Sequence, residues 1–504
     1  MKPSSRVPAP VLTPLRLRLL LVSLLSVSFL GALDNTVVST SLATIAGQLG
    51  ALEHMSWIVV GYTLSSTVLL PVLGKLGDVV GPRSVFLASL VLFLVASLAC
   101  GFAPDMGWLI AARVVQGMSS AGLQLMSQTI VARVTSPRQR PRSLAIIGTA
   151  FPIAILIGPV LGGLITDYWG WPWIFWINLP VGVVALTFAL IAVPHLAPGE
   201  RPSFDIPGTV TLTVGLVALV LAVTWIGEES SRAAALACFL VAAIALAAFF
   251  AVEVRASAPI LPLRLFADRA FAAGTVLSAI IGIGLFSVTS FLPTYIQMAY
   301  RATATVSGLV PIATVFGMLF ANLATGSLVG RSGRYRLYPI LGTTLGALGL
   351  LGMALLPVGL PLAAPMAIMF VVGVGTGCFM SLVVAIVQSA APPSQTGTAT
   401  ATVNLVRQIG STVATAVIGG VIAVGVAAAL PRGLDAATLT PQLVHAADPA
   451  TQAAVAAIYR DVFTPIFLAL AAVYAVGIVA ALLLPRGRLS DDHEPAPATE
   501  PIAA

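Results

Sequence analysis

Residues 17–42, LRLLLVSLLSVSFLGALDNTVVSTSL, form an apolar run that is long enough to cross a membrane as one helix. After Arg18, the only charged residue in this run is Asp34. An ionisable group inside a spanning helix costs several kcal/mol, so such groups usually face a cavity and mark the path of an ion, a proton or a substrate. The run therefore predicts a membrane helix that carries a functional carboxylate.

The composition of the whole chain is that of a membrane protein. Of its 504 residues, 58% are hydrophobic and only 9% are charged, and the mean hydropathy is +1.02. Ordinary soluble domains carry about a quarter charged residues. The apolar runs continue over about 20 residues instead of alternating over about ten, which argues against a β-barrel. The predicted fold class is an all-α polytopic membrane protein.

Apolar runs separated by charged or Pro- and Gly-rich breaks predict fourteen spanning helices. Their centres lie near residues 29, 65, 92, 119, 154, 183, 217, 243, 284, 316, 347, 375, 412 and 473. An even number places both termini on one side. With that side cytoplasmic, the outside segments hold few basic residues, namely Arg232, Arg301, Arg432 and Arg460. The positive-inside rule therefore predicts cytoplasmic termini.

The breaks also predict how the chain is organised. The first run is too long for a signal peptide, so we interpret it as an uncleaved spanning helix. The expected parts are a cytoplasmic N-terminal tail (1–16), a six-helix bundle (17–195), a two-helix insert with its flanking loops (196–256), a second six-helix bundle (257–486) and a disordered cytoplasmic tail (487–504). The second bundle is expected to include a long outside loop at 427–461, with a short amphipathic helix around 450–459.

Several classes of function are not supported by the sequence. The net charge of +7 comes from basic residues in alternate loops, so we expect no nucleic-acid partner. The three cysteines lie in apolar segments without metal or disulfide spacing. Gly74-Lys75 lacks the rest of an ATP-binding loop. We expect no enzymatic activity, no cofactor and no metal. The Arg- and Ala-rich composition is typical of a bacterial protein.

Two loops in corresponding places indicate an internal repeat. Residues 74–83, GKLGDVVGPR, follow the second predicted span, and residues 326–334, GSLVGRSGR, follow the tenth. Glycines permit a tight turn between helices, while Asp78 and Arg83 add charges at the membrane face. Repeated halves of this kind are typical of secondary transporters.

With these features, residues 15–485 resemble the major facilitator superfamily, specifically its fourteen-helix drug:proton antiporters. The segment 74–83 resembles the family loop G-x-L-a-D-r-x-G-r-k in its Gly74, Asp78, Gly81 and Arg83, but has Val79 where Arg is usual. Four further stretches resemble family motifs: Leu33-Asp34-Asn35-Thr36 in the first helix, Arg113-Val-Val-Gln116-Gly117 in the fourth, Gly158-Pro159-Val-Leu-Gly162-Gly163 in the fifth and Arg407-Gln408-Ile-Gly410 in the thirteenth.

The resemblance implies two six-helix bundles with a two-helix insert, and an alternating-access mechanism. It implies proton-driven export of lipophilic, cationic or amphipathic compounds across a bacterial inner membrane by a monomer. The partners are then protons, a small-molecule substrate and the lipid bilayer. Two alternatives remain: an exporter dedicated to one endogenous product, such as an antibiotic, siderophore or lipid, and a membrane sensor or assembly partner that has lost transport.

The resemblance also implies roles for single residues. Asp34, Arg113 and Arg407 are candidates for coupling protons to substrate, although Asp34 is alternatively a carboxylate permanently paired with one of the two arginines. Arg407 is alternatively a side chain that reaches the cytoplasmic surface. Gly158 and Gly162 fit close helix packing as well as the antiporter motif with Pro159 and Gly163.

A cavity between the halves is expected to combine apolar and hydrogen-bonding groups. The candidates are Gln124, Met126, Gln128, Phe151, Phe286, Tyr295, Gln297 and Asn404, each of which is alternatively a core residue. The predicted spans of the second half contain no Asp or Glu near their centres. This favours monovalent, zwitterionic or neutral amphiphiles over multivalent cations.

Overall fold

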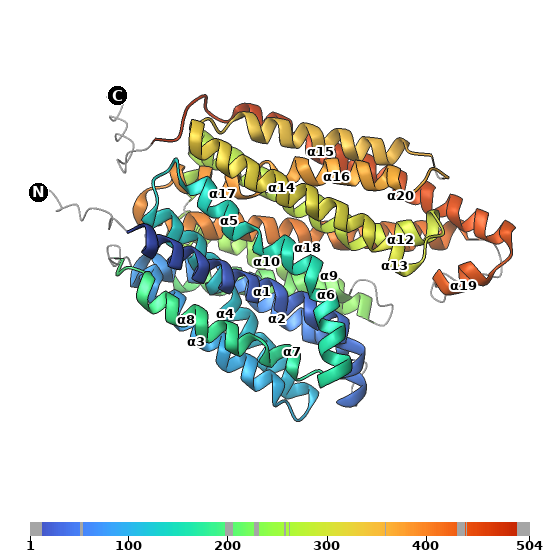
Figure 1. Cartoon of the computed structure of the whole chain (residues 1–504), viewed down its shortest axis with the longest axis horizontal. Helices are drawn as coiled ribbons and strands as arrows, with labels where there is room; N and C mark the ends of the chain where they lie inside the picture. Colours follow the sequence, from blue (N-terminus) through green and yellow to red (C-terminus); the bar gives the residue numbers. More distant parts are fainter. Residues whose placement is uncertain are drawn as a thin grey trace, which may run out of the picture.

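The computed structural model describes residues 13–50, 54–196, 205–225, 231–256, 259–261, 263–357, 359–430, 439 and 441–490. Within these ranges nearly all residues are helical. The helices run roughly parallel in one elongated bundle, with the first half of the chain below and the second half above in Figure 1. The start of α1 and the end of α20 lie at the same end of this bundle.

The N-terminal half (13–196) contains eight described helices, of which α5 with α6 and α7 with α8 each form one span. The helices are α1 (Pro14–Gln48), α2 (Met55–Val80), α3 (Pro82–Gly101), α4 (Met106–Val134), α5 (Arg140–Gly148), α6 (Ala150–Trp169), α7 (Trp173–Trp176) and α8 (Asn178–Ala192). The helix α4 packs against both α2 and α3.

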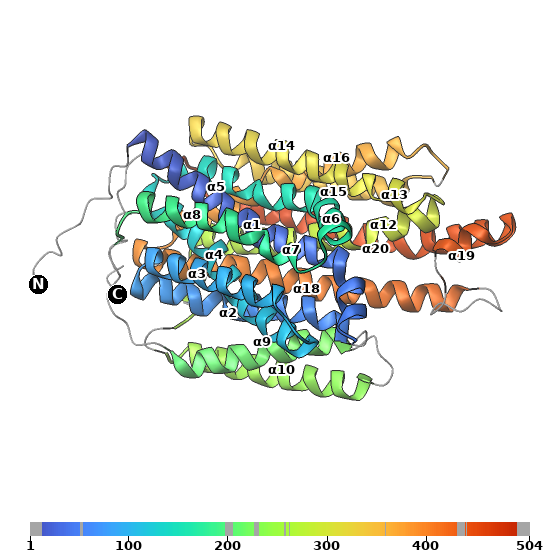
Figure 2. The same cartoon turned by 60° about the horizontal axis from the view of Figure 1, so that its bottom comes forward.

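The helices α9 (Ile206–Trp225) and α10 (Arg232–Glu253) pack on each other at the edge of the bundle, below α2 and α18 in Figure 2. The connection to the second half is fixed by buried polar groups. The Glu253 carboxylate accepts a hydrogen bond from the Ile260 amide at 3.1 Å, and Lys75 Nζ donates to the Pro259 carbonyl at 3.5 Å. These bonds tie the pair of helices to α2.

The C-terminal half (259–490) consists of shorter pieces that join into longer spans. They are η3 (Leu263–Ala267), α11 (Arg269–Ile281), the π-helical turn η4 (Gly282–Phe286), α12 (Ser287–Ala299), α13 (Ala304–Ser307), α14 (Leu309–Ser332), α15 (Leu337–Leu355), α16 (Ala363–Gly377), α17 (Met380–Ala390), η5 (Pro393–Gln395), α18 (Thr396–Ala429), α19 (Pro441–Ala446) and α20 (Pro449–Leu483). The pieces α11, η4 and α12 make one span, as do α16 and α17.

The number of spans agrees with the sequence. In the described residues, 13 helices are long and apolar enough to cross a membrane. The 29-residue helix α4 is not among them, because it carries buried polar groups such as Arg113 and Gln116. Counting α4 gives fourteen, and each predicted centre falls within one of these helices. The prediction of an all-helical polytopic membrane protein is confirmed.

One boundary differs from the prediction. The outside loop at 427–461 was expected to hold a short helix around 450–459. In the structure a helix begins at Pro449 and continues into the last span as α20. The Asp448 carboxylate accepts hydrogen bonds from the Ala450 and Thr451 amides, both at 3.1 Å, which starts the helix. Hydropathy falls at Arg460 and Asp461, but the Ala-rich segment stays helical. Residues 431–438 lie outside the described residues, as do residues 1–12 and 491–504 of the expected tails 1–16 and 487–504.

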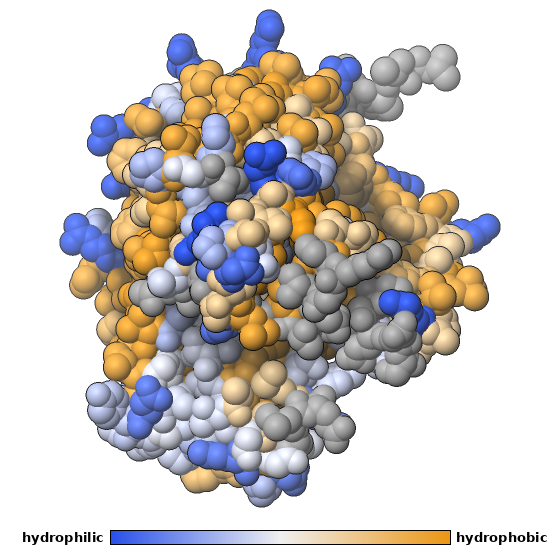
Figure 3. All heavy atoms as spheres, turned by 90° about the vertical axis from the view of Figure 1, so that its right-hand side faces the viewer, coloured by the Kyte–Doolittle hydropathy of each residue, from blue (hydrophilic) through white to orange (hydrophobic). Residues whose placement is uncertain are grey.

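Hydrogen bonds join the two halves near the start of α1 and the end of α20, which we call the basic end. Arg138 donates to the Arg331 carbonyl, Asn322 Nδ2 donates to the Ala145 carbonyl at 3.0 Å, and Gln388 Nε2 donates to the Gln128 carbonyl at 3.1 Å. At the opposite end, α18 and α20 extend beyond their neighbours (Figures 1 and 2). Figure 3 looks onto that end, where hydrophilic side chains gather over its lower part.

Candidate functional site

A cavity of about 540 Å³ lies between the two halves. Its lining comes from α1, α2, α4, α5 and α6 in the first half and from η4, α12, α17 and α18 in the second. Ser39, an exposed residue of α1, lies in the part of the lining nearest the opposite end. Since the halves are hydrogen-bonded at the basic end, the cavity is closed off on that side.

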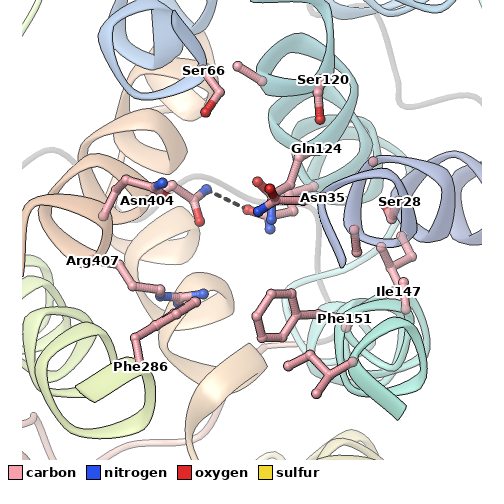
Figure 4. A pocket seen from close by; sticks show the side chains of 18 of the residues that line it. Ser28, Asn35, Ser66, Ser120, Gln124, Ile147, Phe151, Phe286, Asn404 and Arg407 are labelled. Carbon is pink, nitrogen blue, oxygen red and sulfur yellow. Dashed lines mark hydrogen bonds between the residues drawn. The ribbon is translucent and has the colours of Figure 1, made fainter. Parts of the chain in front are cut away.

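The walls of the cavity differ in polarity (Figure 4). Asn35, Gln124, Ser66 and Ser120 present amide and hydroxyl groups from α1, α2 and α4. Across from them, Asn404 Nδ2 donates to Gln128 Oε1 at 2.8 Å, which joins α18 to α4. This side of the cavity offers hydrogen bonds without a net charge.

The other wall is aromatic. The rings of Phe151 and Phe286 lie 5.5 Å apart between centroids, one from each half. Phe286 ends the π-helical turn η4, where a wider turn redirects the chain. At Gly282, η4 contacts α18 so closely that an added Cβ would lie 3.1 Å from the Ser411 amide nitrogen. This close crossing brings Arg407 and Phe286 to the same side of the cavity.

Arg407 is the one charged side chain in the described lining. Its Nε donates to Ser278 Oγ at 3.2 Å and its Nη2 to the Met380 carbonyl at 3.4 Å. The structure shows no acidic partner for it among the described residues. Because it lies well inside α18 and faces the cavity, the alternative in which it reaches the cytoplasmic surface is wrong.

Asp34 is enclosed within the first half and does not line the cavity. Its side chain forms an ion pair with Arg113, and both side chains are fully buried. The amides of Gln116 and Asn178 donate to Asp34 Oδ1 at 2.8 and 2.9 Å. The sequence left open whether Asp34 pairs with Arg113 or with Arg407. In the structure it pairs with Arg113.

Arg113 has further contacts around its guanidinium. Its Nε donates to the Ile58 carbonyl at 3.2 Å, its Nη1 donates to Gln116 Oε1 at 2.8 Å, and its guanidinium carbon lies 4.2 Å from the centroid of the Tyr62 ring. Its Nη2 is buried without a hydrogen-bond partner in the described structure. The arrangement holds the guanidinium in place while both N–H groups of Nη2 lack a partner among the described residues.

Tyr62 connects the ion pair with the cavity, and the sequence analysis did not identify it. Its hydroxyl donates to Ser120 Oγ at 2.7 Å and contacts the Gly31 carbonyl at 3.0 Å. Tyr62, Ser120 and Gly31 all line the cavity. A tyrosine in an apolar span carries no pattern that would reveal this contact, whereas Gln116 lies in the fourth-helix motif described above.

Asp78, near the end of α2, contacts the beginning of α18 at the basic end. Its carboxylate accepts hydrogen bonds from the amides of Gly397 and Thr398 at 2.9 and 2.8 Å, and Arg133 Nη2 lies 3.5 Å away. An anion at a helix N-terminus is stabilised by the unpaired amides and the helix dipole. Gly74 permits the approach, because a Cβ there would lie 2.6 Å from Ala401 Cβ. The contact joins the halves.

Two other motif residues of this loop, Gly81 and Arg83, have roles within the first half. Gly81 ends α2 with φ = +102°, a conformation that favours glycine. Arg83 contacts His195 Nδ1 at 2.8 Å and donates to the Leu190 carbonyl at 3.2 Å, at the end of α8. Arg83 therefore makes no contact with the second half through these bonds.

The motif Gly158-Pro159-Val-Leu-Gly162-Gly163 packs α6 against α1 through two of its glycines. A Cβ on Gly158 would lie 2.7 Å from Thr36 Cβ, and one on Gly162 would lie 2.7 Å from the Val37 carbonyl. Thr36 Oγ1 also contacts the Ala154 carbonyl at 3.1 Å. By contrast, Pro159 is exposed and nothing lies within 4 Å of a Cβ on Gly163.

Five of the eight residues expected in the cavity line it, namely Gln124, Gln128, Phe151, Phe286 and Asn404. The other three expectations are corrected. Met126 is buried against Gly77, whose added Cβ would lie 2.6 Å from the Met126 sulfur. Tyr295 is buried in an aromatic cluster with Phe463, at 4.9 Å between centroids. Gln297 is half-buried outside the lining. These three side chains lie on helix faces that do not line the cavity.

Comparison with known proteins identifies the family. The family model of the Major Facilitator Superfamily matches residues 24–415. The chain belongs to this superfamily. It is 34% identical to an uncharacterised MFS-type transporter of Mycobacterium tuberculosis over 499 residues, which cover 97% of this chain and 73% of the relative. It is 31% identical to the multidrug transporter protein MdtP of Bacillus subtilis over 406 residues, covering 80% of this chain and 75% of the relative.

The fold of the superfamily is also found by structure. The crystal structure of the human organic anion transporter MFSD10 matches with a TM-score of 0.59 at 16% identity, covering 93% of this chain and all of that chain. At this identity the match shows the fold alone. The protein is accordingly a multi-pass membrane transporter with the major facilitator fold, and not an enzyme.

Proposed function

We propose that this protein exports small amphipathic molecules in exchange for protons by alternating access. Export is supported by the relatives, among them a protein named as a multidrug transporter. The observation that carries the proton-coupling proposal is the ion pair between Asp34 and Arg113. Both side chains are fully buried, and they lie behind the residues that line the cavity. If one member of a buried ion pair can take up a proton, the pair can exist in a charged and a partly neutralised form. Such a pair is suited to switching the protein between two conformations.

The mechanism follows from the contacts of the pair. Uptake of a proton by Asp34 removes its charge and leaves Arg113 with the Ile58 carbonyl, Gln116 and the Tyr62 ring. Removing one partner of a buried pair typically costs about 3–5 kcal/mol, so the neighbouring groups must rearrange. Because Tyr62 and Ser120 belong to the cavity wall, this rearrangement changes the substrate site.

We assign the basic end to the cytoplasm by the positive-inside rule. The contact of Asp78 with the start of α18 then closes the cytoplasmic side, and the structure corresponds to a state that releases substrate outward. In the opposite state this contact is broken. The protein would reside in a bacterial inner membrane with both termini inside. One chain forms the whole cavity, which supports action as a monomer.

The roles proposed for the motif residues follow the same geometry. Asp34 and Arg113 couple the proton, Asp78 with Gly74 closes the cytoplasmic side, and Gly158 with Gly162 fixes α6 on α1 beside Asp34. The expected cationic substrates are not carried forward, because the described lining of the cavity contains no carboxylate.

The test uses purified protein in proteoliposomes with an imposed pH gradient. A panel of lipophilic dyes is loaded, and efflux and internal pH are followed together. Efflux of at least one dye that depends on the gradient and moves protons in the opposite direction supports the proposal. Efflux that is indifferent to the gradient contradicts proton coupling, and transport of a single compound out of a broad panel favours a dedicated exporter.

A further inference from the structure

The charge of the cavity is set by one residue. Its described lining contains asparagine, glutamine, serine, threonine and tyrosine side chains, but Arg407 is its one ionised group. Asp34 and Arg113 lie behind the wall and cancel each other's charge. A molecule in the cavity therefore meets a net positive charge.

Among the residues that the structure describes, no acidic side chain forms an ion pair with Arg407. A guanidinium stays charged at any physiological pH, and a charge at membrane depth usually faces an opposite charge or water. Arg407 has two neutral oxygen acceptors, Ser278 Oγ and the more distant Met380 carbonyl. Its Nη1 has no hydrogen-bond partner among the described residues, and its nitrogens point toward the centre of the cavity in Figure 4.

The surroundings of Arg407 fit an aromatic anion. Phe286 and Phe151 lie next to its guanidinium in Figure 4, with their rings 5.5 Å apart. Asn404 and Gln124 offer amide groups at the other side of the cavity. A planar apolar body would pack against the two rings, while its carboxylate would accept from the guanidinium in a charge-assisted hydrogen bond.

We propose that the substrates of this transporter are amphipathic organic anions, typically aromatic carboxylates, and that Arg407 binds their negative group. This inference rests on the proposed function as an exporter and specifies its substrate class. It differs from the resemblance to drug:proton antiporters, from which cationic compounds were expected.

The test compares two dyes that share one ring system and differ in charge. Fluorescein is a xanthene with a carboxylate, and rhodamine 123 is a cationic xanthene. Their gradient-driven efflux from proteoliposomes is measured for the unaltered protein, Arg407→Gln and Arg407→Lys. We expect efflux of fluorescein and little of rhodamine 123. Arg407→Gln should lower fluorescein efflux about tenfold, because a charge-assisted hydrogen bond is lost. Arg407→Lys should keep part of it.

Two further variants make the test specific for charge. Arg255→Gln removes a positive charge from an exposed position at the end of α10, far from the lining, and should change nothing. Asn35→Asp places a carboxylate in the cavity wall. It should reduce fluorescein efflux and increase that of rhodamine 123. Thermal unfolding in detergent verifies that each variant is folded.

The outcomes separate the two proposals. If folded protein moves rhodamine 123 but not fluorescein, or if folded Arg407→Gln moves fluorescein as well as the unaltered protein does, the anion inference is overturned and export stands. If the folded, reconstituted protein moves neither dye under a gradient, nor any member of the wider panel, both proposals are overturned.

Discussion

The guanidinium carbon of Arg113 lies 4.2 Å from the centroid of the Tyr62 ring, and the hydroxyl of the same tyrosine bonds to Ser120 in the cavity wall. One side chain thus contacts the buried charge with its ring and the cavity with its polar tip. A desolvated cation–π contact contributes about 2 kcal/mol, so we expect that a displacement of the Arg113 guanidinium would also act on the ring.

The first prediction concerns this hydroxyl. Tyr62→Phe keeps the ring beneath Arg113 but removes the bonds to Ser120 and the Gly31 carbonyl. We expect substrate binding to persist while fewer protons are exchanged per substrate, because the link between the two sites is weakened. The measurement is proton flux and dye efflux from the same proteoliposomes. An unchanged ratio of the two fluxes in Tyr62→Phe would contradict a role for the hydroxyl in coupling.

The second prediction concerns the ion pair. Asp34→Asn should abolish gradient-driven efflux, and it should also destabilise the protein by about 3–5 kcal/mol, because Arg113 is left as an uncompensated buried charge. Replacing both residues by Asp34→Asn with Arg113→Gln should restore much of the stability but not the transport. Thermal unfolding and efflux are measured for each protein. Asp105→Asn, at an exposed helix start, is the control.

The third prediction compares two adjacent glycines. Gly162→Ala brings a Cβ to 2.7 Å from the Val37 carbonyl, so α6 must move away from α1. We expect a loss of about 1–3 kcal/mol in unfolding free energy, typical of overpacking, and slower transport. Gly163→Ala meets nothing within 4 Å and should leave both unchanged. Equal effects of the two substitutions would show that α6 does not depend on this contact.

The fourth prediction concerns closure at the basic end. Asp78→Ala removes the acceptor from the Gly397 and Thr398 amides, a loss of about 0.5–2 kcal/mol by comparison with helix caps. The halves should separate more often there. Spin labels at the exposed positions Val80 and Ser394 report this as a larger population of long distances in pulsed electron resonance.

The matched control for closure is Arg133→Gln. It removes only the 3.5 Å ion pair of Asp78, to a partly exposed arginine. The N–O distance of 3.5 Å is long compared with the 2.7–2.9 Å of a charge-assisted hydrogen bond, so the effect of Arg133→Gln on the distance distribution should be smaller than that of Asp78→Ala. The reverse order would assign the closure to the ion pair instead of the helix start.

The fifth prediction is a pH dependence at the start of α20. The hydroxyl of Thr451, together with backbone amides, lowers the pKa of Asp448. A lowered pKa in the folded state means that the contribution to stability is complete above the ordinary Asp pKa of about 3.9 and is lost as the pH falls through the folded value. Amide exchange at residues 450–453, corrected for intrinsic rates, should accelerate in acid. Asp448→Asn should remove this dependence.

The sequence was sufficient for the helices because each span needs a continuous apolar run, and every predicted centre lies in a helix. It also singled out Asp34 and Arg113, since charges within spans are rare. It did not reveal which way a side chain faces. Tyr295 and Phe286 are both aromatic residues on the ninth span, but the π-helical turn at Gly282–Phe286 and the packing of Phe463 determine that only Phe286 faces the cavity.

Arg407 shows the same limit. The position of Arg407 in the sequence does not show which way its side chain faces, and in the structure it lines the cavity. A helix was expected around 450–459, but its continuation into the last span as α20 was not. Hydropathy identifies the apolar residues that cross the membrane, but not the ends of the helix. A helix that extends beyond the apolar residues is therefore not predicted by it.

The hydrogen bonds at the basic end are made largely to main-chain atoms. Asp78 contacts two amides, while Asn322, Gln388 and Arg138 contact carbonyls of the other half. A substitution at the residue that supplies a main-chain atom leaves that atom in place, whereas a substitution at the side-chain partner removes the bond. Selection for variants with altered closure should therefore favour changes at the side-chain partners. Two residues that supply amides are exceptions: a Cβ on Gly397 would lie 2.6 Å from the Gly74 carbonyl oxygen, and the Thr398 hydroxyl also donates to Asp78 at 2.9 Å.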